Sequence, residues 1–331
     1  MTACGLLLSA VVNHHYGAQI DAIAAEVDVP LRRLETESAA KFLDCVTAAF
    51  FSRDLFSGNI AKPDVASSAF FEIVNAAPRL RWLQVFSSGL DLPLYAPSLA
   101  RGVNVTNSAG TTALPIAQSV AAAVLAQSRG FGHWLGVQRQ RCWTPLTGTN
   151  RPRDLEGQRV VVVGTGPIGM EIGRLLGTLG FHTTAIRQRA VPTPHFDQSL
   201  VVGQLDELLP TCDWLVLACP LTDRTHGLIN ARRLDLLPSH ARVANVGRGE
   251  LLDEVALEQR LLSGRLAGAF LDVFSQEPLA SESPLWDLPQ VWITPHNCAA
   301  SLGHEDRIVK KFMTDLRLWL VNSGRSSQPT N

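Results

Sequence analysis

Short apolar runs alternate with amphipathic stretches along the chain, and this alternation is typical of an α/β protein. In the first hundred residues we expect strands at 6–12, 44–51, 81–86 and 103–105, and a helix at 64–77. These elements predict a small α/β layer whose loops, at the carboxyl ends of parallel strands, are available to a ligand.

The alternation becomes more regular in the second half of the chain. A helix at about 112–129 is apolar nearly all round, so we expect it to be buried between domains or against a second copy of the chain. After a loose polar stretch at 130–153, the pattern predicts strands at 182–187, 213–219, 241–246, 268–273 and 290–294, helices at 204–209, 230–237 and 254–263, and a final helix at 303–321. Such regular repetition predicts a doubly wound parallel sheet with right-handed crossovers.

A glycine-rich turn follows the most apolar strand of the second half. Four consecutive valines at 160–163 are apolar on both faces, as in a strand that helices cover on both sides. Gly164 permits a tight turn, Gly166 lets the backbone approach a pyrophosphate, and Gly169 lets the next helix pack closely. Because the motif lies between a strand and a helix, it predicts dinucleotide binding, which the same glycines in an ordinary loop would not.

Composition and charge limit the kinds of partner. The chain has 331 residues, 46% of them hydrophobic and 18% charged, which is enough for two globular domains. Its formal net charge of -1 gives no reason to expect a nucleic acid or an acidic membrane as partner. The apolar start resembles a short signal core, but the first basic residue is Arg32, so a buried first strand is the better interpretation. No apolar run approaches the ~20 residues that span a bilayer.

Six cysteines are scattered along the chain without a Cys-x-x-Cys pair. Their positions, in predicted strands or beside the core, fit reduced thiols better than a disulfide framework or a metal site. We therefore expect a cytoplasmic protein that binds no metal.

Titratable side chains follow three of the later predicted strands. Arg248 lies between two glycines, Glu277 follows the strand at 268–273, and His296 follows the strand at 290–294. Singly, each has a plain explanation, as a solvated loop charge or a histidine that caps a turn. Together, at strand ends of one sheet, they supply a cation for a carboxylate, an imidazole to protonate a carbonyl oxygen, and a carboxylate to orient that imidazole. These are the parts needed to reduce a 2-keto acid.

Two loops of the first half carry further candidates. Arg53 is an isolated cation after the strand at 44–51. Ser88 and Gly89 lie in a turn of small residues whose backbone N–H groups could hold an anion. The alternatives are a surface arginine and an ordinary turn.

With these residues in place, the sequence resembles the D-isomer-specific 2-hydroxyacid dehydrogenases. The resemblance is dense from about 155 to 300 and looser before that, and its matching runs lie at 163–169, 219–229, 245–249, 268–278 and 294–296. It implies a Rossmann doubly wound parallel cofactor domain at 105–298, inserted in a smaller flavodoxin-like α/β substrate domain at 1–104 and 299–331. The family is commonly a homodimer through its cofactor domain, which the apolar helix at 112–129 would suit.

The resemblance also assigns roles to residues. It implies that Arg248, Glu277 and His296 are the catalytic set. It implies that Ser88 and Gly89 present N–H groups to the carboxylate of a 2-keto or 2-hydroxy acid, with hydride transfer from a nicotinamide and proton transfer from His296. The cofactor contacts that it implies are Gly164, Gly166, Pro167, Ile168, Gly169, Pro220, Thr225, Val246 and, near the nicotinamide, Asp272.

The sequence departs from the family pattern at a few positions. Where many members close the second cofactor-domain strand with Asp, this chain has Arg187 and Arg189. Since cations accommodate a 2′-phosphate, we predict NADP(H) as the preferred cofactor, with NAD(H) possible; the alternative is that both arginines face water. Gln118, where members often have Glu, and the pair Asn297 and Cys298 after the histidine have no interpretation from sequence.

Several functions stay open within this resemblance. A reductase of glyoxylate, hydroxypyruvate or a bulkier keto acid is favoured by the two arginines, and NAD-dependent oxidation of a substrate such as phosphoglycerate, formate or phosphite is an alternative. An NAD(P)-sensing corepressor is the alternative from another class, because a fold alone does not fix function. Arg53 raises the hypothesis that the far end of the substrate is polar or anionic.

Overall fold

The computed structural model describes residues 4–56, 64–90, 92–189 and 191–325. Contacts divide the chain into unit 1, residues 1–111 and 301–331, and unit 2, residues 112–300. The sequence predicts the two boundaries after 104 and 298, and the structure places both later. Asn107 and Ser108 accept hydrogen bonds from Gln84 in the sheet of unit 1, while the Ala300 N–H donates to Asn297 in unit 2.

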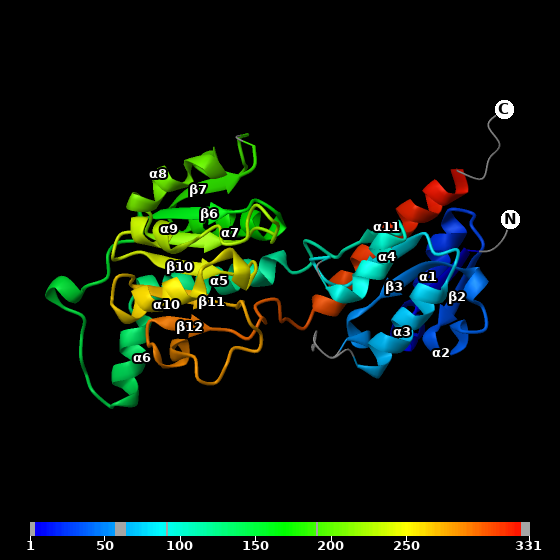
Figure 1. Cartoon of the computed structure of the whole chain (residues 1–331), viewed down its shortest axis with the longest axis horizontal. Coiled ribbons are helices and arrows are strands. Elements are labelled where there is room, and N and C mark those ends of the chain that lie inside the picture. Colours follow the sequence, from blue (N-terminus) through cyan, green and yellow to red (C-terminus); the bar gives the residue numbers. More distant parts are fainter. Residues whose placement is uncertain (1–3, 57–63, 91, 190, 326–331) are drawn as a thin grey trace. The chain divides into compact units, whose positions relative to one another are not determined.

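Unit 1 is built on a five-stranded parallel sheet in the order β2-β1-β3-β4-β5, the flavodoxin-like order. Its strands are β1 (Cys4–Leu8), β2 (Leu31–Glu35), β3 (Val46–Phe51), β4 (Trp82–Val85) and β5 (Asn104–Thr106). Its helices are α1 (Ala10–Glu26), α2 (Thr36–Ala39), α3 (Val65–Ala76), α4 (Ala96–Ala100) and α11 (His304–Arg325). The expected flavodoxin-like layer is therefore present, and helix α11 returns to it from the far end of the chain (Figure 1).

Alternate side chains of the unit 1 strands enter two different cores, as the two-residue period of a strand requires. Leu7 packs on one face with the apolar side of α3, whereas Leu6 and Leu8 pack on the other face with α1 and α11. On that second face the rings of Phe50 and Phe312 stack at 4.1 Å, so the last helix is fixed to the middle of the sheet.

Two elements at the start of unit 1 differ from the sequence prediction. The strand expected at 6–12 ends at Leu8, because the Ser9 hydroxyl accepts a hydrogen bond of 3.1 Å from the Val12 N–H and begins α1. Helix α1 and strand β2 were not predicted. The apolar run 6–12 joins the strand and the first turn of the helix without a break, so periodicity alone does not separate them.

Unit 2 is built on a seven-stranded parallel sheet in the order β12-β11-β10-β9-β6-β7-β8. Its strands are β6 (Arg159–Val163), β7 (His182–Arg187), β8 (Gln198–Val201), β9 (Trp214–Leu217), β10 (Arg242–Asn245), β11 (Gly268–Leu271) and β12 (Val291–Ile293). Its helices are α5 (Ala113–Ser128), α6 (Phe131–Arg139), α7 (Pro167–Thr178), α8 (Leu205–Leu208), α9 (Ala231–Leu236) and α10 (Glu254–Leu262). This is the Rossmann order with one further strand, and the order reverses between β6 and β9.

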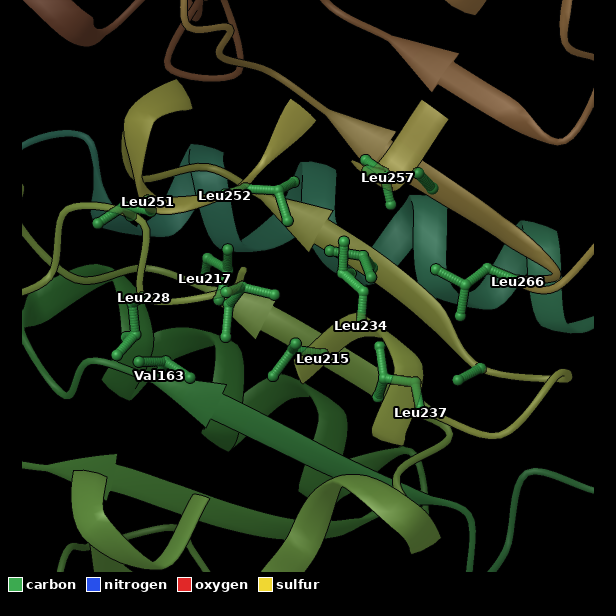
Figure 2. Packing of buried hydrophobic residues seen from close by; sticks show 14 of the residues in the cluster. Val163, Leu215, Leu217, Leu228, Leu234, Leu237, Leu251, Leu252, Leu257 and Leu266 are labelled. Atoms are coloured by element: carbon green, nitrogen blue, oxygen red, sulfur yellow. The ribbon is translucent and has the colours of Figure 1, made fainter. Parts of the chain in front are cut away.

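Helices cover both faces of the unit 2 sheet. On one face Val161 and Val163 pack with leucines from α9 and α10, as Figure 2 shows around Leu215 and Leu217. On the other face Val160 and Val162 pack with α5 and α7. The run of four valines is therefore buried on both sides, as the sequence predicts.

Two elements of unit 2 were missed by the sequence analysis. Helix α6 lies in the stretch 130–153 that was expected to be loose, and none of its side chains is buried, so it has no apolar period to detect. Strand β8 is short and only partly buried. Within the described residues, no helix combines the length and apolar character needed to cross a bilayer.

Candidate active site

The turn after β6 has the shape that a dinucleotide requires. Gly164 has φ +103°, and a Cβ there would lie 2.7 Å from the Ala218 carbonyl oxygen. A Cβ on Gly169 would lie 1.9 Å from the Gly164 oxygen, so only glycine lets α7 approach the strand. At Gly166, by contrast, no described atom lies within 4 Å of an added Cβ, and α7 begins at the next residue, Pro167. The turn thus offers open space at a helix N-terminus, which fits a pyrophosphate.

The end of β7 lies beside this turn and carries Arg187. The Gly164 N–H donates to the Ile186 carbonyl at 2.9 Å, which brings the two strand ends together. Arg187 is half-buried and donates to the Thr193 hydroxyl at 3.2 Å, while Arg189 is exposed. No ion pair of the described chain joins either arginine to a carboxylate, so the corner next to the glycine turn is cationic.

The other predicted cofactor residues follow strands on the same edge of the sheet. Pro220 and Thr225 come after β9, and the Thr225 hydroxyl donates to the Pro220 carbonyl at 2.8 Å. Val246 directly follows β10 and is 6% exposed. Because carboxyl ends of parallel strands meet at one edge, these residues share it with the glycine turn.

Glu277 and His296 form a pair 19 positions apart in the sequence. The Nδ1 atom of His296 lies 2.8 Å from Oε2 of Glu277, and the Phe274 N–H donates to Oε1 of the same carboxylate at 3.1 Å. Both side chains are partly exposed, at 43% for the histidine and 32% for the glutamate. The imidazole is therefore held through Nδ1, which leaves Nε2 as the atom that can exchange a proton with a ligand.

Charges and hydrogen bonds separate the pKa values of this pair. The hydrogen bond that His296 donates to Glu277 raises the pKa of His296, against the opposing effects of burial and of the nearby Arg248 charge. Burial alone would raise the pKa of Glu277, but hydrogen bonds from His296 and the Phe274 N–H, with the charges of His296 and Arg248, outweigh it and lower that pKa. The charged imidazolium and the carboxylate therefore stabilise each other.

Asp272 holds the turn that carries His296. Its carboxylate is buried, and its Oδ1 accepts hydrogen bonds from the Thr294 hydroxyl at 2.7 Å, the Asn297 N–H at 2.8 Å and the Cys298 N–H at 3.1 Å. The Asp272 carbonyl also accepts from the His296 N–H at 2.8 Å. His296 itself has φ +51°, a left-handed conformation that is uncommon for residues other than glycine. The sequence analysis gave Thr294 no role, although its position at the end of β12 could have suggested one.

Cys298, one of the departures, belongs to this turn. Its Sγ lies 3.3 Å from the Thr294 hydroxyl, and burial raises the pKa of the thiol to about 12. The group stays protonated and fills space beneath the turn. Gln118 lies exposed on α5, and nothing in the structure explains its identity.

The loop with Arg248 is held against the segment that leads to Glu277. The Asn245 side chain donates to the Arg248 carbonyl at 2.8 Å and accepts from the Gly247 N–H at 3.1 Å. At Gly249 an added Cβ would lie 1.9 Å from the Phe274 carbonyl carbon, so the two backbones touch. The predicted trio of Arg248, Glu277 and His296 thus lies in one part of unit 2, with Arg248 close enough for its charge to act on the other two.

The predicted substrate residues of unit 1 lie at neighbouring strand ends. Arg53 follows β3 and its guanidinium carbon is 5.6 Å from the ring centre of Phe86, the residue before the loop 87–89. In that loop the Ser88 carbonyl accepts from Asn107 at 2.8 Å, and the Gly89 carbonyl accepts from Ser87 at 2.7 Å. Both carbonyls are tied to the protein, which fixes the shape of the loop.

The chain is similar to proteins of one family. A model of the D-isomer specific 2-hydroxyacid dehydrogenase NAD binding domain matches residues 121–298. A D-3-phosphoglycerate dehydrogenase of Mycobacterium leprae is 32% identical, with 77% of this chain and 48% of that protein covered, so the chain spans about half of its length. A glyoxylate reductase of Korarchaeum cryptofilum is 31% identical over 71% of each chain. A D-isomer specific 2-hydroxyacid dehydrogenase of Xanthobacter autotrophicus Py2, solved in complex with NADPH and MES, has a TM-score of 0.74 and 26% identity, with 96% of each chain covered.

Proposed function

Because the chain belongs to the D-isomer specific 2-hydroxyacid dehydrogenase family, we propose that it reduces a 2-keto acid to a D-2-hydroxy acid with NADPH. The observation that carries this proposal is the 2.8 Å pair of His296 and Glu277, within reach of the Arg248 charge and on the same edge of the sheet as a turn that fits a dinucleotide. Bound NADPH would supply the hydride. The remaining chemistry belongs to residues of this chain.

In this proposal His296 is the acid that protonates the carbonyl oxygen from Nε2, and Glu277 keeps the imidazole charged and oriented. Arg248 binds the substrate carboxylate with its planar fork. In unit 1, the loop with Ser88 and Gly89 is the part proposed to offer backbone N–H groups to a carboxylate. Asp272 acts through the turn that it holds, because its carboxylate accepts three hydrogen bonds from residues around His296.

The first test is consumption of reduced coenzyme with a panel of 2-keto acids. We expect turnover of glyoxylate, hydroxypyruvate or a bulkier keto acid, and a higher kcat/KM with NADPH than with NADH. Tight binding of the dinucleotide without its consumption in the presence of any keto acid would instead support the alternative role of an NAD(P)-sensing corepressor. Faster oxidation of a D-hydroxy acid such as 3-phosphoglycerate with NAD would favour the dehydrogenase alternative, which the Mycobacterium leprae relative represents.

The coenzyme preference is proposed from the cationic end of β7. A 2′-phosphate that gains a hydrogen bond from Arg187 would gain about 1.5–3 kcal/mol, which corresponds to roughly 10- to 100-fold in affinity. Arg187→Ser together with Arg189→Ser should therefore lower kcat/KM with NADPH by that factor and leave the NADH value nearly unchanged. Arg174→Ser on α7, whose arginine pairs with Glu171 instead, is the matched control. An equal loss with both coenzymes, or a clear preference of the unmodified protein for NADH, would contradict the assignment.

The dependence of activity on pH follows from the raised pKa of His296. Reduction needs the protonated imidazole, so its rate should be constant at low pH and fall as pH rises through the raised pKa of His296. Oxidation needs the neutral imidazole, so its rate should rise with pH over the same range. Glu277→Gln removes the charge that raises the pKa, so the descending limb should move to lower pH. Glu282→Gln, at an exposed position on the same segment, is the control. If the descending limb of Glu277→Gln lies at the same pH as that of the unmodified protein, Glu277 does not set the pKa of the catalytic acid.

We also propose that the protein is a homodimer through unit 2. Helix α6 and the residues after it expose large apolar side chains, with Phe131 48%, Leu135 46% and Trp143 99% exposed. Such residues normally avoid water when they occur together. A molar mass in solution equal to one chain would exclude this assembly.

A further inference from the structure

Arg53 is a cation placed on an aromatic surface beside the substrate loop of unit 1. Its guanidinium carbon lies 5.6 Å from the ring centres of both Phe56 and Phe86, and its Nη1 donates to the Phe56 carbonyl. No salt bridge joins it to a carboxylate among residues 4–56, 64–90, 92–189 and 191–325. Phe86 is bonded through its N–H to Phe51 of β3, so the cation is held at the carboxyl ends of β3 and β4.

The Arg53 charge reaches His304, the first residue of α11. It is partly buried, and its Nε2 is a buried atom without a hydrogen-bond partner in the part of the chain that the structure describes. A buried polar atom without a partner is destabilising, so an imidazole nitrogen in this position needs an explanation. The Arg53 charge acts on His304, together with Arg307 and Glu305 of the same helix.

Burial and the positive charges of Arg307 and Arg53 lower the pKa of His304, and Glu305 opposes them only in part. The imidazole is therefore neutral at neutral pH and has one N–H to donate. Among the described residues, no salt bridge ties Arg53 or His304 to a carboxylate, a combination that an anionic ligand would satisfy.

We propose that Arg53 and His304 form a subsite for a second anionic group, a carboxylate or a phosphate, at the far end of the keto acid. This inference rests on the proposed function, because the loop 87–89 is the proposed site of the first carboxylate. Phe86 carries the Arg53 guanidinium on its ring and precedes that loop directly, so one substrate can reach both. The Arg53 fork binds the anion in a bidentate pair, and the buried Nε2 of His304 gains its partner from the same group.

The test compares keto acids that differ only at the far end. The first pair is 2-oxoglutarate and 2-oxopentanoate, where a carboxylate replaces a methyl group; the second is 3-phosphohydroxypyruvate and hydroxypyruvate. We expect the anionic member of at least one pair to have a kcat/KM roughly tenfold or more above its neutral partner, since a hydrogen bond to a charged group contributes about 1.5–3 kcal/mol. The pair that shows the advantage distinguishes a carboxylate from a phosphate.

Variants should remove the advantage without removing turnover. Arg53→Met should lower kcat/KM for the anionic substrate roughly tenfold more than kcat/KM for its neutral partner. Arg53→Lys, which keeps the charge, should retain part of the difference between the two substrates. His304→Phe should reduce the advantage, and His304→Asn, which keeps a donor, should preserve more of it. Arg32→Met is the matched control, because Arg32 also lies over a ring, Phe42 at 4.1 Å, but belongs to β2.

A pH series supplies a readout that a purely structural role would not change. Protonation of His304 adds a charge to the subsite, so the KM for 2-oxoglutarate should fall as pH is lowered through the histidine range, relative to that for 2-oxopentanoate. His304→Asn should abolish this relative change.

Failure of the subsite and failure of the proposed function have different signatures. Turnover of both members of each pair at equal efficiency, or an anionic advantage that survives in Arg53→Met, would overturn the subsite and leave the reductase intact. Absence of turnover with every substrate would overturn the reductase instead. In that case binding alone tests the subsite, through the rise in Tm when 2-oxoglutarate is added with NADP, compared with the rise for 2-oxopentanoate. A larger rise for 2-oxoglutarate that is lost in Arg53→Met supports the subsite. Equal rises for the two acids overturn it.

Discussion

Replacing His296 with asparagine is expected to lower kcat by about 100- to 10,000-fold, the contribution usual for a positioned acid. The loss should fall on kcat and leave NADPH binding nearly unchanged, because the residues proposed to bind the dinucleotide lie on the glycine turn and the end of β7. Asparagine is preferred to alanine as the test, since it tolerates the left-handed φ of +51° at this position and keeps the turn intact. Steady-state rates and an equilibrium titration with NADPH measure the two quantities separately.

The control for this variant is His240→Asn. His240 also lies near a carboxylate, with Nε2 3.1 Å from Asp213, but at the start of β10. It should retain full activity. Turnover of His296→Asn at the rate of the unmodified protein would show that another group supplies the proton.

Replacing Arg248 with alanine is expected to raise KM for the keto acid roughly 100-fold or more, because a bidentate pair loses two hydrogen bonds of about 1.5–3 kcal/mol each. The effect on kcat at saturation should be smaller, although removal of the Arg248 charge also changes the electrostatic surroundings of His296. Arg248→Lys should recover only part of the affinity, since an ammonium cannot form the planar fork. The exposed Arg265→Ala is the control, and an unchanged KM in Arg248→Ala would place the carboxylate elsewhere.

Much of the fold could be predicted because its signals are local. The four valines of β6 are apolar on both faces, and Gly169 is forced by a backbone contact with Gly164, five residues earlier. The strands of both sheets were found within a few residues for the same reason, except β2 and β8. Helix α1 was missed because its first turn continues the apolar run of β1, and α6 because none of its side chains is buried.

The site could be predicted only in part, because its contacts join distant segments. Sequence reasoning identified Arg248, Glu277 and His296 from their places after strands, but not that Asp272 would hold the histidine turn with three hydrogen bonds. The role proposed for His304 was invisible in the sequence, since an unpartnered nitrogen is a property of the surroundings and not of the residue type.

The contact between Gly249 and Phe274 has a consequence for how such an enzyme can change. The backbone beside Arg248 lies directly on the segment that leads to Glu277. Any side chain at Gly249 would therefore displace both Arg248 and Glu277. The parts proposed to bind the carboxylate and to transfer the proton therefore form a single rigid module that tolerates little variation. New substrate preferences would have to arise at loops outside this module, and the strand ends of unit 1 around Arg53 are open to such changes.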